Sequence, residues 1–268
     1  MVRHPQPAMF VRGDTDLFPC PRTELFLSHG AGTTPAELLE ALSDLRGYFG
    51  LTRLEFRAPD LNPDDPSQIV AIQALAGAVI HMTLLTCLSI PGSFVTEALL
   101  LHISLLPRLR ELVIFPASMP CSLHGREHRG FISLRSLDIP NATFLRRFLS
   151  YSIQDLETLK VRDLDPDSIT NIARKLPNLL HLDIKGQNFP SPKIFVLGAC
   201  FQLEEIVIST QHPLGMDDSD LHRFRAMFRN LRSLSTTTWG FPGDVGPHRA
   251  THSREGTGAS LAVETNGV

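Results

Sequence analysis

The chain has 268 residues, of which 43% are hydrophobic and 20% are charged, and its formal net charge is −3. This balance provides enough apolar material for a core and excludes a chain that is disordered throughout. The slightly negative charge gives no general attraction to nucleic acid or to an anionic membrane, so we expect neither of them as a partner.

The first 50 residues predict an irregular beginning. Residues 1–21 contain four prolines, lack the apolar core of a secretory signal and are expected to be flexible. Residues 22–50 predict a strand at residues 24–28 and a helix from about residue 35 to residue 48. We interpret residues 22–50 as an irregular N-terminal repeat or cap for the regular segment that follows.

Residues 51–239 repeat a six-residue phrase, Leu-x-x-Leu-x-apolar, with one weaker copy at the end. Successive phrases begin 34, 24, 25, 22, 23, 24 and 28 positions apart. Most of these intervals lie in the range of roughly 20–29 residues that is typical of leucine-rich repeats. The phrases begin at Leu51, Leu85, Leu109, Leu134, Leu156, Leu179, Leu203 and Leu231.

A helix is predicted between successive phrases. At Asp65, Asp165 and Ser191 a capping residue is followed by proline, the favoured residue at the first position of a helix. The other expected caps are Ser93, Asn141 or Thr143, and Asp218 or Ser219. The predicted helices cover residues 67–80, 94–105, 144–151, 167–175, 192–200 and 220–228. Each helix is too short to be stable alone, so packing between repeats must hold it.

This order of elements predicts an α/β leucine-rich-repeat solenoid, a horseshoe with a parallel inner sheet and outer helices. Residues 240–268 are rich in Gly, Ser, Thr and His and have no period, so we expect a disordered C-terminal tail. Trp239 is expected to cover the end of the core.

The cysteines and the hydropathy pattern indicate an intracellular protein. Cys20, Cys87, Cys121 and Cys200 lie far apart and form no C-x-x-C pair, which fits a reducing compartment. No stretch approaches the roughly 18 apolar residues that a membrane-spanning helix needs. We therefore expect a cytoplasmic or nuclear location.

The spacing of Cys121, His124 and His128 is that of half a zinc site. A structural zinc site needs four ligands, and no fourth Cys or His is close in the sequence, so we favour a polar loop and expect neither metal nor cofactor. The acidic clusters stand where helices begin, which favours capping over catalysis. The common nucleophile, phosphate-binding and metalloprotease motifs are also lacking, so we expect no enzyme, although a nucleophile in the Cys121 loop is an alternative.

The repeats resemble the ribonuclease-inhibitor-like leucine-rich repeats of fungal F-box proteins over residues 51–239. They share a repeat length of mostly 22 to 28 residues, a helix in each repeat and no fixed asparagine after the strand. The resemblance implies that the repeats select a substrate for a cullin-type ubiquitin ligase, to whose adaptor the F-box binds. Residues 35–39 are similar to the start of an F-box, but the repeats begin at Leu51, and no complete F-box is recognisable. The adaptor is therefore a partner only if an F-box is supplied elsewhere.

Residues between the core leucines should alternate outward onto the concave face of the sheet. Cys87, Ser89, Pro91 and Pro140 are among these outward positions. The densest group of charged outward residues offers hydrogen-bond donors to a carboxylate or an acidic peptide. This candidate partner-binding site consists of Lys160, Arg162, His181, Asp183 and Lys185, and its alternative is a solvated, charge-balanced strand face.

The sequence thus predicts a non-catalytic scaffold that binds a partner protein on the concave face. Two alternatives are a substrate-recognition component of a ubiquitin ligase, which follows from the resemblance, and a truncated, non-functional relative. The identity of the partner is not encoded in any motif that we find.

Overall fold

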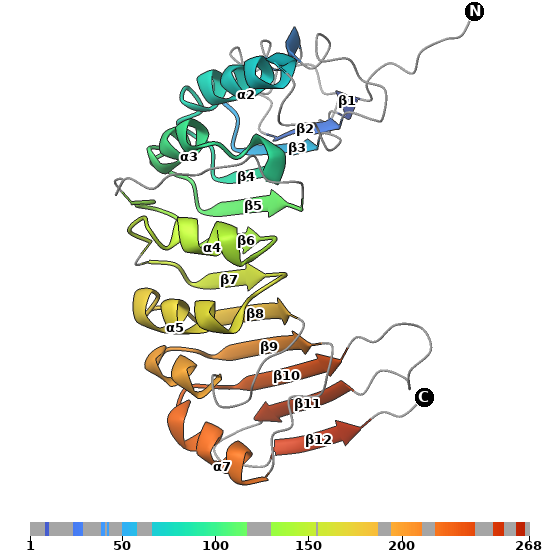
Figure 1. The fold of residues 1–268 in the computed structure, drawn as a ribbon, viewed down its shortest axis with the longest axis vertical. Helices are drawn as coiled ribbons and strands as arrows, with labels where there is room; N and C mark the ends of the chain where they lie inside the picture. Colours follow the sequence, from blue (N-terminus) through green and yellow to red (C-terminus); the bar gives the residue numbers. More distant parts are fainter. Residues whose placement is uncertain are drawn as a thin grey trace, which may run out of the picture. The chain divides into compact units, whose positions relative to one another are not determined.

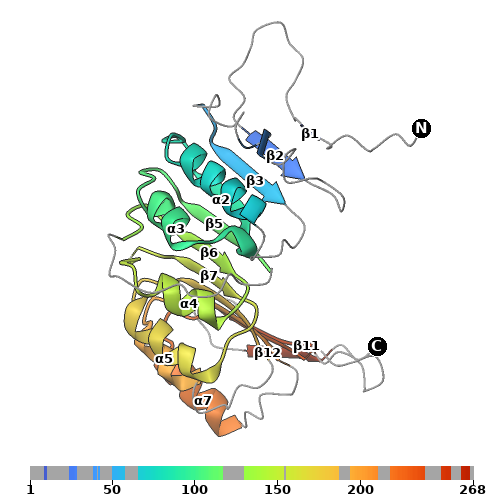
Figure 2. The ribbon, with the colours of Figure 1, turned by 45° about the horizontal axis from the view of Figure 1, so that its top comes forward.

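The computed structural model describes residues 9–10, 24–28, 39–40, 42, 50–57, 66–116, 130–153, 155–186, 194–210, 218–238, 249–254 and 261–265. The chain forms two compact units, residues 1–134 and residues 135–268. In each unit, parallel strands form a sheet and helices lie along one side of it (Figures 1 and 2). The fold class is the predicted α/β leucine-rich-repeat solenoid.

The first unit contains four successive parallel strands, β2 to β5, with the short strand β1 antiparallel to β2. The helices α2 and α3 pack against each other. The strands are β1 (Met9–Phe10), β2 (Glu24–Ser28), β3 (Arg53–Arg57), β4 (Cys87–Pro91) and β5 (Glu111–Phe115), and the helices are α2 (Pro66–Val79), the 3-10 helix η2 (Gly92–Phe94) and α3 (Glu97–Ser104).

The second unit contains the parallel strands β6 to β10, followed by two antiparallel strands. Its strands are β6 (Ser136–Ile139), β7 (Thr158–Val161), β8 (His181–Gly186), β9 (Glu205–Thr210), β10 (Ser233–Thr238), β11 (Arg249–Arg254) and β12 (Leu261–Thr265). Its helices are α4 (Ala142–Phe148), α5 (Pro166–Lys175), the 3-10 helix η3 (Phe195–Ala199) and α7 (Asp218–Met227).

The repeated leucines stand in register in the core, as the sequence predicts. In the first unit the register aligns Leu54, Leu88 and Leu112. In the second unit it aligns Leu137, Leu159, Leu182, Ile206 and Leu234. These eight side chains are at most 6% exposed. Because burial of one such side chain is worth about 1.5–3 kcal/mol, the aligned rows stabilise the stack of repeats.

A backbone feature that the leucine pattern does not reveal recurs at the start of six described strands, β4, β5 and β7 to β10. The carbonyl of Thr52 accepts two hydrogen bonds, from the amides of Thr86 (2.7 Å) and Cys87 (3.1 Å) in the next repeat. The same double acceptance recurs at the carbonyls of Thr86, Arg135, Glu157, Leu180 and Glu204. The carbonyl of the residue just before one strand thus accepts hydrogen bonds from the first amide of the next strand and from the amide that precedes it.

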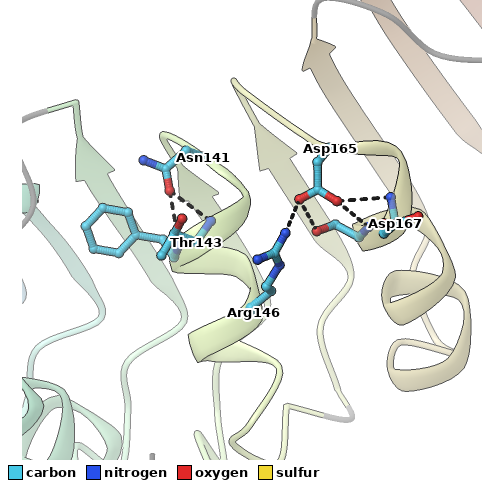
Figure 3. Close-up of polar contacts among 7 residues, drawn as sticks. Asn141, Thr143, Arg146, Asp165 and Asp167 are labelled. Atoms are coloured by element: carbon cyan, nitrogen blue, oxygen red, sulfur yellow. Dashed lines mark hydrogen bonds and ion pairs between the residues drawn. The ribbon is translucent and has the colours of Figure 1, made fainter. Parts of the chain in front are cut away.

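Two predicted helix starts are confirmed in the second unit. Asn141 Oδ1 accepts hydrogen bonds from the amides of Thr143 (3.0 Å) and Phe144 (3.1 Å) and caps α4 (Figure 3). Asp165 Oδ1 accepts from the amides of Asp167 and Ser168, both at 3.0 Å, and caps α5. The expected caps Asp65 and Ser191 lie outside the described residues.

Two other helices differ from the prediction. The helix expected over residues 94–105 begins at Glu97, because Thr96 rather than Ser93 caps it: Thr96 Oγ1 accepts from the amide of Leu99 at 3.3 Å. Ser93 instead lies buried in η2. The α-helix α7 begins at Asp218, so both of its expected caps lie in its first turn.

The helix expected over residues 192–200 is, in its described part, mainly the 3-10 helix η3. Gly198 explains the difference, because it lowers the helix propensity and also permits a close approach of α7. A Cβ atom on Gly198 would lie 2.7 Å from Met227 Cε, which indicates that the two elements are in tight contact at this position.

Both ends of the chain contain strands that the sequence does not predict. Strand β1 lies in the segment expected to be flexible, and β11 and β12 lie in the segment expected to be disordered. Strand β11 pairs with β10, which would otherwise be the unpaired edge of the sheet. Pairing between strands satisfies backbone N–H and C=O groups and does not require a particular pattern of side chains. The composition of these segments therefore does not predict the strands. Trp239 lies outside the described residues.

Candidate functional site

The five predicted partner-binding residues lie together on the neighbouring strands β7 and β8. The register pairs Thr158 with His181 and Lys160 with Asp183, and Arg162 follows directly after β7. Lys160, Arg162 and Lys185 are exposed, whereas His181 and Asp183 are half-buried. The structure therefore brings all five residues to one part of the sheet face that points away from the core leucines.

Asp138 on β6 extends this group, although the sequence does not single it out. The register places Asp138 beside Lys160, and Arg162 Nη2 lies 3.5 Å from Asp138 Oδ2. The Asp138 side chain is only 20% exposed, and its Oδ1 is buried without a hydrogen-bond partner in the described part of the chain. The carboxylate is thus held in place by Arg162 but only partly satisfied.

Glu205 on β9 extends the group on its other side. The register pairs Glu205 with His181, and His181 Nδ1 lies 3.3 Å from Glu205 Oε2. Both side chains are nearly half exposed, so water screens their interaction and the pair adds little stability. We use the term charged patch for Asp138, Lys160, Arg162, His181, Asp183, Lys185 and Glu205.

Asp183 lies at the centre of the charged patch and interacts electrostatically with most of the other members. Burial raises the pKa of its carboxyl above the usual value, and the negative charges of Asp138 and Glu205 raise it further. Lys160 and Arg162 act in the opposite direction but do not cancel the shift. The ionised form of Asp183 is therefore disfavoured in the folded chain, chiefly because of burial.

The sheet face of the first unit differs from the prediction at β4. Cys87, Ser89 and Pro91 occupy outward positions, yet all three are buried. The strands on either side carry longer side chains, and Arg57 of β3 reaches over the ring of Phe115 on β5, with its Cζ 5.2 Å from the ring centroid. Pro91 of β4 pairs with Phe115 in the sheet register and so lies next to this cation–π contact.

Cys87 shows what burial does to a thiol on this face. Burial raises the pKa of Cys87 to about 12, and the neighbouring Glu111 adds to the rise through its charge and a hydrogen bond. Only the thiolate is a good nucleophile, so Cys87 is poorly suited to attack a substrate at neutral pH. Pro140, another expected outward residue, is also buried.

The remaining motifs do not form a site in the described part of the chain. The Cys121 loop lies outside the described residues. Among the residues that are described, no group of three or more His, Cys, Asp or Glu side chains could hold a metal ion. The search of the same residues also finds no helix that is long and apolar enough to cross a membrane. Asp165 and its neighbours act as a helix cap, as predicted.

Comparisons with known proteins assign the chain to no family. No family model matches the chain, and no curated protein matches it in sequence. The chain is similar to the solved structure of the internalin InlF of Listeria monocytogenes, with 15% identity and a TM-score of 0.44. That comparison covers 81% of this chain and 54% of the internalin, so the chain spans about half of that protein.

Two further solved structures are similar at the same low level. Internalin C2 of Listeria monocytogenes is 16% identical, with a TM-score of 0.39 and coverage of 81% of each chain. A leucine-rich-repeat protein of Leptospira interrogans is 12% identical, with a TM-score of 0.27 and coverage of 76% of this chain and 56% of that one. The assignment of the repeat fold therefore depends on the strand register and the leucine rows of this chain.

Proposed function

We propose that this chain is a non-catalytic scaffold that binds a partner protein through the charged patch on the sheet face of residues 135–268. The observation that carries the proposal is the concentration of seven ionisable side chains on four adjacent strands, β6 to β9, or directly after one of them. Strand neighbours are only about 4.8 Å apart, so these side chains form one continuous surface.

The leucine rows beneath the patch support this proposal. Leu159 and Leu182 are almost completely buried directly under the strands that carry Lys160 and Asp183. A surface that is held in place before binding loses little conformational entropy when a partner docks, so weak individual contacts can add up to useful affinity.

The test is a quantitative affinity capture with the complete chain as bait. The variant Lys160→Ala/Arg162→Ala/Lys185→Ala removes the cations of the charged patch. The matched control, Arg108→Ala/Arg174→Ala/Lys175→Ala, removes three exposed cations that do not belong to the patch. We expect the patch variant to lose specific proteins that the wild type and the control both retain, at equal thermal stability. Identical capture by all three baits would exclude the patch as the binding site.

We propose a role in a ubiquitin ligase as a second candidate function. It is supported only by the resemblance of the repeats to those of fungal F-box proteins. The test is co-purification of the chain with the cullin and its adaptor. Retention of a partner without either of them would favour a scaffold outside such a ligase.

A further inference from the structure

The charges of the patch are sorted along the direction of the strands. Three rows cross β6 to β9, and the register defines them. The first row contains Ser136, Thr158, His181 and Glu205, and the second contains Asp138, Lys160, Asp183 and Val207. The third pairs Lys185 with Ser209, and we include Arg162 in it because Arg162 follows directly after β7. With histidine counted as neutral, the formal charges of the three rows are −1, −1 and +2.

The patch is therefore an electric dipole whose formal charges sum to zero, whereas the five residues singled out in the sequence carry a formal charge of +2 when histidine is counted as neutral. Its positive end lies where β7 and β8 end, and its negative end lies nearer to their beginnings. Asp138 and Glu205, which the sequence analysis does not include, cause this difference.

The negative end contains a carboxylate that is only partly satisfied. Asp183 is half-buried among two other carboxylates, and Oδ1 of Asp138 has no hydrogen-bond partner in the described part of the chain. An additional cation placed here would act in the same direction as Lys160 and Arg162, which favour the ionised form of Asp183. A purely acidic segment would instead bring more negative charge towards three carboxylates, and a purely basic one would approach Arg162 and Lys185.

We propose, building on the proposed function, that the partner contributes an extended segment with an acidic and a basic side chain two residues apart. The acidic side chain lies on Arg162 and Lys185, and the basic side chain lies on Asp183 and Glu205. The spacing follows from β8 itself, because Asp183 and Lys185 are two residues apart on one face, which is about 6.6 Å. An extended segment that runs along β8 has the same spacing between alternate side chains.

The experiment is a selection from a library of random twelve-residue peptides on the immobilised full chain. We expect the wild type to enrich peptides with an acid-x-base or base-x-acid pattern. The variant Arg162→Gln/Lys185→Gln should lose the selection for the acid, and Asp183→Asn/Glu205→Gln should lose the selection for the base. The control variant Arg174→Ala/Lys175→Ala should retain both.

A charge exchange on one selected peptide sharpens the test. Each neutralising variant should lower the affinity for the peptide by about two- to fivefold, the range that one or two exposed ion pairs provide. The variant Lys185→Glu should lower the affinity further. A second peptide, in which lysine replaces the acidic residue, should bind this variant with the original affinity.

The possible results separate the two proposals. Enriched peptides that are uniformly acidic, yet depend on Arg162 and Lys185, would overturn the dipolar partner and leave the charged patch as the binding site. Enrichment that no patch variant changes, or no enrichment at all, would overturn the proposed function and this inference together.

Discussion

Arg146 Nη2 donates a hydrogen bond to Asp165 Oδ2 at 2.8 Å and so joins a side chain of α4 to the N-cap of α5 (Figure 3). The same carboxylate oxygen accepts from Ser168 Oγ at 2.8 Å, while Oδ1 accepts the two amides at the start of α5. One aspartate thus caps its own helix and binds the helix of the preceding repeat. Neighbouring repeats are held together on the helical side as well as in the sheet.

Loss of the cap should cost more stability than loss of the ion pair. We expect Asp165→Ala to lower the free energy of unfolding by about 1 kcal/mol or somewhat more, because α5 loses its cap. Arg146→Ala should cost less than about 1 kcal/mol, because the arginine is exposed and its ion pair is screened. Urea denaturation measures both, and Asp165→Asn, which can still cap, is the matched control. An equal loss in both alanine variants would contradict this assignment.

The same aspartate predicts a loss of stability in acid. Burial acts to raise the pKa of Asp165, but hydrogen bonds from Ser168 and the neighbouring Arg146 outweigh it and hold the pKa below its usual value. The folded state therefore favours the ionised carboxyl, and this contribution is complete above the unfolded pKa of about 3.9 and fades as the pH falls below it. We expect the stability difference between wild type and Asp165→Asn to shrink between pH 6 and pH 3. A constant difference would show that the charge of Asp165 is unimportant.

Asp183 predicts the opposite pH dependence. Burial and the nearby carboxylates raise its pKa, so the folded state disfavours the ionised form, and stability is gained as the pH falls through the folded pKa. We expect Asp183→Asn to be at least as stable as the wild type at pH 7 and to lack this gain in acid. Denaturation at several pH values checks the stability. A marked destabilisation at pH 7 would indicate that Asp183 is a structural residue.

The leucine rows predict large differences between core and surface substitutions. Leu159 is fully buried beneath β7, and we expect Leu159→Ala to lower the free energy of unfolding by about 2–5 kcal/mol. Ile132 is 79% exposed, so Ile132→Ala should change it by less than about 0.5 kcal/mol. Thermal and urea denaturation of the two variants provide the comparison. A small effect of Leu159→Ala would contradict the continuous core.

The sequence is sufficient to predict the repeat fold because each repeat uses the same local signals. Leucines at fixed spacing define the buried face, and an aspartate followed by proline marks the start of α5. These signals act over a few residues, so they can be read without knowledge of the neighbouring repeats. The start of α3 is predicted wrongly, because local signals do not distinguish two good capping residues. Ser93 and Thr96 are both suitable caps, and only packing selects Thr96.

The candidate site is only partly predictable, because it depends on contacts between repeats. Alternation places Lys160 and Asp183 on the outward face correctly. It does not show that Asp138 and Glu205 complete the patch, which follows from the pairing of β6 and β9 with their neighbours. Nor does it show that Cys87 is buried, because that depends on the size of side chains from the adjacent strands.

The carbonyls that accept two hydrogen bonds keep the alignment of neighbouring strands independent of the length of each repeat. Thr52 and Thr86, 34 residues apart, are linked in the same way as Glu157 and Leu180, which are 23 residues apart. An insertion in the connecting segments would therefore leave the next strand start unchanged. Chains of this kind can gain or lose residues away from the sheet during evolution while the spacing of their strands stays constant.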